Sequence, residues 1–78
     1  MNENEIKKNL GVALKRIRKR LNLTQEKLAE KSGLSRRYII EIEKGKANIS
    51  LATFGKLCDS TGIQLPDLFY FTFRWDRY

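Results

Sequence analysis

Apolar residues recur at intervals of three and four along the first part of the chain: Ile6, Leu10, Leu14, Ile17 and Leu21. This spacing predicts one apolar stripe of an α-helix over about residues 5–21. Acidic residues precede the stripe and basic residues crowd its end, as the helix dipole favours. Asn22 can end the helix in a left-handed conformation.

Three further helices are predicted from polar capping residues and from the glycines that follow each helix. Thr24 caps a helix over residues 25–31, with Leu28 and Ala29 facing inward. Ser35 caps the next, over residues 36–44, whose buried side comprises Leu34, Ile39 and Ile42.

Ser50 caps the last of the three, over residues 51–61, with an inward side formed by Leu51, Phe54, Leu57 and Cys58. Gly33, Gly45 and Gly62 provide the turns, and Pro66 suits the first turn of a short fifth helix over residues 66–70. The pattern therefore predicts a compact all-α domain.

The end of the chain follows a different pattern, because Phe71, Phe73 and Trp75 alternate with polar residues. A period of two predicts a β-strand, and a strand needs a hydrogen-bonding partner. We expect these three aromatic residues to pair across the two-fold axis of a homodimer. The alternative is that residues 70–78 fold back over their own core.

The 78 residues suffice for one domain, and 16 lysines and arginines against nine acidic residues give a net charge of +7. A basic domain of this kind suits a polyanion such as DNA, RNA or an acidic membrane surface, although solvated lysines would give the same balance. Without a signal-like segment, a long apolar run or a second cysteine, the chain is expected in the cytoplasm.

Enzymatic chemistry is not expected. The chain has no histidine and no phosphate-cradling glycine loop, and its one cysteine, Cys58, stands at a predicted core position. No cluster of cysteines and histidines suggests a metal, and no cofactor is expected.

Residues 25–44, two short helices joined through Gly33, have the form of a helix-turn-helix. Ala29 is small enough for the second helix to cross closely, and the buried side of that helix leaves one outward face of the kind that fits a DNA major groove. This face comprises Ser35, Arg36, Arg37, Ile40, Glu41 and Lys44.

Residues 10–69 resemble the Cro/C1-type helix-turn-helix domain of the XRE family. The match is carried by Thr24-Gln25, Leu28-Ala29, Gly33-Leu34-Ser35 and Ile42-Glu43-Lys44-Gly45. The resemblance implies a five-helix, lambda-repressor-like DNA-binding domain over residues 1–69, followed by a tail over residues 70–78. It also implies transcriptional control, as a repressor bound as a homodimer to a palindromic operator in double-stranded DNA.

Base contacts are expected from Ser35, Arg36, Arg37, Ile40 and Glu41. Arginine can bind guanine through two hydrogen bonds, which favours base contact by Arg36 or Arg37. The alternative is that both arginines contact phosphate only. Glu41 can accept from cytosine or pair with Arg37 one helical turn earlier, and the residues do not decide between these roles. Ile40 can contact a thymine methyl group or pack against a neighbouring loop.

Phosphate contacts are implied for the residues that flank this face: Thr24, Gln25, Tyr38, Lys44, Lys46 and Asn48. For Lys15, Lys19 and Arg20 a solvated helix face is the favoured interpretation. The resemblance also pairs Arg18 with Glu43 in a partly buried salt bridge, which makes Arg18 structural.

Two rival functions stay open. Small proteins of this family also serve as antitoxins or as controllers of restriction–modification genes, and an antitoxin would bind a toxin as a protein partner as well as DNA. A non-specific RNA or DNA binder would show equal affinity for any sequence.

Overall fold

Four helices follow one another along the residues that the structure, a computed structural model, describes, which are 2–64 and 67. Their bounds are α1 Glu3–Arg20, α2 Gln25–Ser32, α3 Arg36–Glu43 and α4 Leu51–Thr61. This part of the chain is all-helical and contains no strand. The predicted fifth helix lies outside it except for Asp67, whose backbone N–H donates to the Gln64 carbonyl at 3.0 Å. The aromatic tail lies outside it altogether, so both remain predictions.

Each helix begins at a polar side chain that accepts a hydrogen bond from the backbone of the first turn. Thr24, Ser35 and Ser50 do so for α2, α3 and α4, as the sequence predicts. The start of α1 was predicted two residues too late. Asn2 accepts from the Glu5 N–H at 2.8 Å, while the Glu5 carboxylate accepts the Asn2 N–H at 3.2 Å. This reciprocal capping box extends the helix to Glu3.

The turns after the helices use left-handed backbone where the sequence places residues that tolerate it. Asn22 has φ 58° after α1, while Gly33 and Gly62 follow α2 and α4 with φ 76° and 75°. Each change of direction is therefore completed within a few residues of the helix end.

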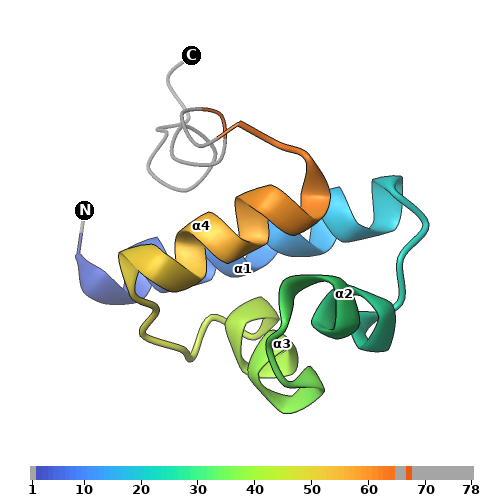
Figure 1. Ribbon diagram of the computed structural model, residues 1–78. Coiled ribbons are helices and arrows are strands. Elements are labelled where there is room, and N and C mark those ends of the chain that lie inside the picture. Colours follow the sequence, from blue (N-terminus) through green and yellow to red (C-terminus); the bar gives the residue numbers. More distant parts are fainter. Residues whose placement is uncertain (1, 65–66, 68–78) are drawn as a thin grey trace.

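The core lies where the four helices meet, and its fully buried members are Leu14, Leu28, Ile39, Ile42 and Leu57. Helix α3 packs against α1 and α2, and α2 also packs against α4. Figure 1 shows α2 and α3 together below α1 and α4. None of the helices in this part of the chain is long and apolar enough to span a bilayer.

Two predicted core residues are wrong. Leu21 and Leu51 are 43% and 78% exposed. Leu21 follows the last residue of α1 and Leu51 is the first residue of α4. The apolar pattern of the sequence therefore extends, at the end of α1 and at the start of α4, beyond the part of each helix that its neighbours cover.

The backbones of α1 and α3 approach each other closely at Gly11. A Cβ atom at this position would lie 2.5 Å from the carbonyl oxygen of Ile42 and 2.8 Å from that of Glu43. Only glycine leaves room for the backbone of α3 to lie this close to α1.

Candidate nucleic-acid interface

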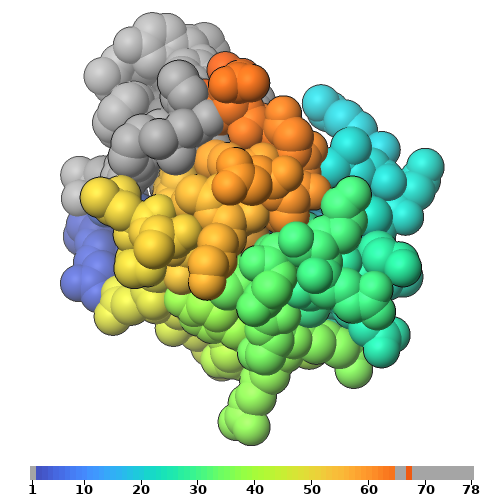
Figure 2. Space-filling view, viewed as in Figure 1, coloured from blue at the N-terminus to red at the C-terminus, as the bar shows by residue number. Residues whose placement is uncertain are grey.

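Helix α3 is buried on one side and exposed on the other. Ile39 and Ile42 are almost completely buried beneath it, and Ser35 at its start accepts the Tyr38 N–H at 3.0 Å. Green and light-green atoms of α2 and α3 form the lower edge of the molecule in Figure 2. The buried side of α3 thus anchors the helix in the core, and its other side faces solvent.

The residues expected to contact bases lie together at this surface. Ser35, Arg36 and Arg37 are exposed, whereas Ile40 and Glu41 are half-buried. Arg37 and Glu41 form no ion pair within residues 2–64, so the structure does not show the intrahelical alternative for Glu41.

Two of the residues expected to contact phosphate already donate a side-chain hydrogen bond within the protein. The Tyr38 hydroxyl donates to the Asn48 carbonyl at 3.2 Å, which ties α3 to the following loop. The Gln25 amide donates to Glu43 Oε1 at 3.1 Å, and its second proton points elsewhere. A phosphate contact from the Tyr38 hydroxyl would require its internal bond to break, whereas one from Gln25 would not.

The other four residues of that set have exposed side chains. Thr24 caps α2 by accepting the Lys27 N–H at 3.0 Å, which leaves its hydroxyl proton for another acceptor. Lys44, Lys46 and Asn48 follow α3 and are exposed. Polar groups able to donate therefore stand at both ends of the helix-turn-helix.

Beneath the surface, a buried ion pair joins α1 to the end of α3. Arg18 Nε lies 2.7 Å from Glu43 Oε2, and Arg18 Nη2 lies 3.1 Å from Oε1. Arg18 also donates to the Leu23 carbonyl at 2.9 Å. The hydrogen bonds to Glu43 raise the pKa of the Arg18 guanidinium, against burial, which lowers it.

Because Gln25 donates to the same carboxylate, three helices meet at Glu43. The family resemblance pairs Arg18 with Glu43, as the structure has them, but nothing in the sequence places Gln25 in this network. Bidentate pairing of this kind fixes orientation as well as distance, so it sets the position of α3 relative to α1.

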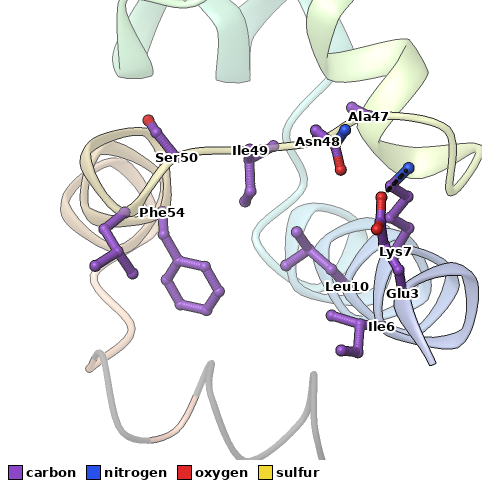
Figure 3. Close-up of a pocket in the computed structure, with 10 residues that line it drawn as sticks. Glu3, Ile6, Lys7, Leu10, Ala47, Asn48, Ile49, Ser50 and Phe54 are labelled. Carbon is purple, nitrogen blue, oxygen red and sulfur yellow. Dashed lines mark ion pairs between the residues drawn. The ribbon is translucent and has the colours of Figure 1, made fainter. Parts of the chain in front are cut away.

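An apolar groove of about 170 Å³ lies between the start of α1 and the start of α4, away from the Arg18–Glu43 pair. Ile6 and Leu10 of α1 face Phe54 of α4 across it, and Ile49 of the connecting loop closes one side (Figure 3). Leu51 also lines the groove. This surface leaves apolar side chains beside solvent.

Known proteins similar to this chain share its helix-turn-helix, formed here by α2 and α3. The helix-turn-helix family profile matches residues 14–68. Control protein C.MunI of a Mycoplasma species is 42% identical over 67 residues, which cover 85% of this chain and 90% of that protein. Control protein C.BamHI of Bacillus amyloliquefaciens is 40% identical over 70 residues, covering 88% and 86%.

Two further proteins differ more in length. The immunity repressor protein of Bacillus phage phi105 is 45% identical over 56 residues, but the match spans only 39% of that repressor. Among solved structures, the clp gene regulator ClgR from Corynebacterium glutamicum superposes with a TM-score of 0.81 at 28% identity. That match covers 86% of this chain and 71% of the ClgR chain. The chain belongs to the XRE-type helix-turn-helix family of transcriptional regulators.

Proposed function

We propose that the protein binds double-stranded DNA sequence-specifically, as a homodimer on a palindromic operator, and represses transcription there. The observation that carries this proposal is the exposed side of α3, where two adjacent arginines stand on a helix whose other side is locked into the core. A helix presented in this way fits the major groove, in which each base pair offers a distinct pattern of donors and acceptors.

Different residues of this face suit different base edges. An arginine can donate two hydrogen bonds to guanine, Glu41 can accept from cytosine, and Ile40 can contact the methyl group of thymine. Lys44, Lys46, Asn48 and Thr24 would contact phosphates on either side and so fix the register without reading sequence. No step of this function needs an enzyme activity, a metal or a cofactor.

Self-association is supported by the apolar groove at the starts of α1 and α4, where Leu51 is 78% exposed. A second copy of the chain would remove such a surface from water. Phe71, Phe73 and Trp75, outside the described residues, are proposed to pair across the same two-fold axis. A chain ending at Phe69 should then sediment as a monomer, and a dimer would contradict the role of the tail.

Selection of bound sites from random duplex DNA tests the proposal most directly. A two-fold symmetric site should emerge, with half-sites about one helical turn apart. Transcription in vitro from a promoter that carries this site should fall when the protein is added. Equal affinity for unrelated duplexes at matched salt would contradict sequence-specific binding.

A second candidate function is that of a control protein, which regulates restriction–modification genes. It is favoured by relatives named control proteins that align over nearly their whole length, as C.MunI and C.BamHI do. Increased transcription from the same promoter would favour an activating control protein over a repressor. Co-purification of a toxin-like protein that covers the apolar groove would favour an antitoxin.

A further inference from the structure

An open hollow of about 510 Å³ lies at the start of α2, beside the exposed side of α3. Lys15 and Lys19 reach it from α1, and Arg36 reaches it from the first position of α3. Thr24 and Gln25, at the start of α2, also line it. The fold thus places basic side chains from distant parts of the sequence around one hollow.

The hollow has an excess of positive charge. Lys15, Lys19 and Arg36 take part in none of the ion pairs found among residues 2–64 and 67. One acidic residue, Glu26, also lines the space, while Arg18 is already neutralised by Glu43. Three cations without an acidic partner therefore surround a space that is open to solvent, which suits an anion.

The two neighbouring arginines of α3 differ in their relation to this hollow. Arg36 lines it, whereas Arg37 does not. Consecutive residues of an α-helix point about 100° apart, so one side chain can turn back toward α1 and α2 while the next leaves along the outward face. This difference separates two residues for which the sequence predicts the same role.

We infer that Arg36, Lys15 and Lys19 together bind one phosphate group of the DNA backbone, which leaves Arg37 to read the base. The inference rests on the proposed function, because the anion is a phosphate of the same DNA that α3 contacts. The hollow adjoins the exposed start of α3, so a strand passing that end of the helix runs over it. Lysine binds phosphate as a compact charge, and such contacts fix register rather than sequence.

The test compares four single variants and the Arg36→Ala/Lys15→Ala double variant on the selected operator and on its single-base variants, over a range of salt concentrations. Arg36→Ala and Lys15→Ala remove charges from the hollow, and Arg36→Lys keeps the charge but removes the bidentate fork. Lys56→Ala is the matched control, because Lys56 is an exposed lysine of α4 that does not line the hollow. Thermal unfolding of each variant verifies that it is folded.

Arg36→Ala and Lys15→Ala should each weaken binding to all sequences by the same factor. Each should also reduce the slope of log K against log salt, by no more than about one unit, since the cations share a single phosphate contact. Combined, they should cost less than the product of the single losses, because both act on one phosphate. Arg36→Lys should retain base preference and most of the slope.

Two results would overturn the inference. In the first, Arg36→Ala and Arg36→Lys relax preference at one base pair while the salt slope of the Arg36→Lys variant is unchanged, which would make Arg36 a base reader. In the second, Lys15→Ala behaves as Lys56→Ala does. Both results presuppose a selected operator, whereas failure to select any operator counts against the proposed function itself.

Discussion

The two sides of α3 follow opposite rules. On the buried side, Gly11 allows the backbones of α1 and α3 to lie almost in contact, and Glu43 accepts hydrogen bonds from Arg18 and Gln25. On the exposed side, Arg36 and Arg37 form no ion pair with any residue in the described part of the chain. The buried residues therefore fix the position of α3, while the exposed residues are free to carry the proposed recognition of DNA. Changes on the two sides should therefore have separable effects.

The largest effect is expected from breaking the buried ion pair. Glu43→Ala leaves the Arg18 guanidinium, whose side chain is 11% exposed, without its carboxylate partner. Removing one member of such a pair costs about 3–5 kcal/mol, because a charge stays buried and uncompensated. Urea unfolding of both proteins would measure the loss.

The double variant Arg18→Met/Glu43→Leu serves as the control for this prediction. It removes both charges, so it should recover much of the stability lost in Glu43→Ala. A loss below about 1 kcal/mol in the single variant would match a solvent-exposed pair and contradict the buried role.

The next largest effect concerns the helix crossing. Gly11→Ala places a methyl group within 2.8 Å of two carbonyl oxygens of α3. Overpacking of this kind costs about 1–3 kcal/mol, which outweighs the better helix propensity of alanine. Thermal or urea unfolding should show destabilisation.

Gly55→Ala is the matched control, because a Cβ atom at this position of α4 meets no atom of residues 2–64 and 67 within 4 Å. This substitution should stabilise the protein by about 0.5–1 kcal/mol. Equal effects of the two alanines would show that the close crossing at Gly11 imposes no packing constraint.

A change on the exposed side should leave stability almost untouched. Arg37→Ala should alter the free energy of unfolding by no more than about 0.5 kcal/mol, because the side chain is exposed and forms no ion pair within the described part of the chain. It should nevertheless remove about 1–3 kcal/mol of discrimination at one base pair. Competition binding with single-base operator variants measures this loss. An equal loss for every sequence would argue that Arg37 contacts phosphate alone.

The smallest effect is a pH dependence from the core. Burial raises the pKa of the Cys58 thiol, and the negative charge of Asp59 adds to the shift. The folded protein then keeps this proton at a pH at which the unfolded chain, with a thiol pKa of about 8.5, has released it. Stability from this group is therefore complete below that pH and falls as the pH rises above it.

Comparison with Cys58→Ala isolates this contribution, since every other ionisable group is present in both proteins. Above about pH 8.5 the parent protein should lose stability more steeply than the variant does. Parallel curves would show that the thiol ionises equally easily in the folded and unfolded states.

Most of the fold could be predicted because it depends on local patterns. The bounds of α4 and the caps Thr24, Ser35 and Ser50 follow from residue types and spacing, and the structure agrees with them. The start of α1 could not be placed as well, because several polar residues near it can each act as a cap. Leu51 shows that helical periodicity does not reveal where the covering surface ends.

The candidate site was predictable to a lesser degree, because it depends on distances between helices. The resemblance identified the outward face of α3, but the sequence could not show that Gln25 donates to Glu43. Nor could it show that Lys15, Lys19 and Arg36 line the same hollow, since residues of α1 and α3 come near each other only where these helices pack in the folded protein. Gly11 appears in the sequence only as an unfavourable residue within a helix.

The left-handed residues at Asn22, Gly33 and Gly62 have a consequence for how quickly the protein reaches its native state. The turn at Gly33 lets α3 pack against α2 directly, whereas α1 packs against α3 and α4 packs against α2, each across one intervening helix, so the longest of these contacts still spans few residues of a short all-helical chain. Chains with this organisation fold in roughly microseconds to milliseconds. Folding of the single chain would therefore add little delay to the response of such a regulator, which would instead follow the rate of synthesis and of subunit association.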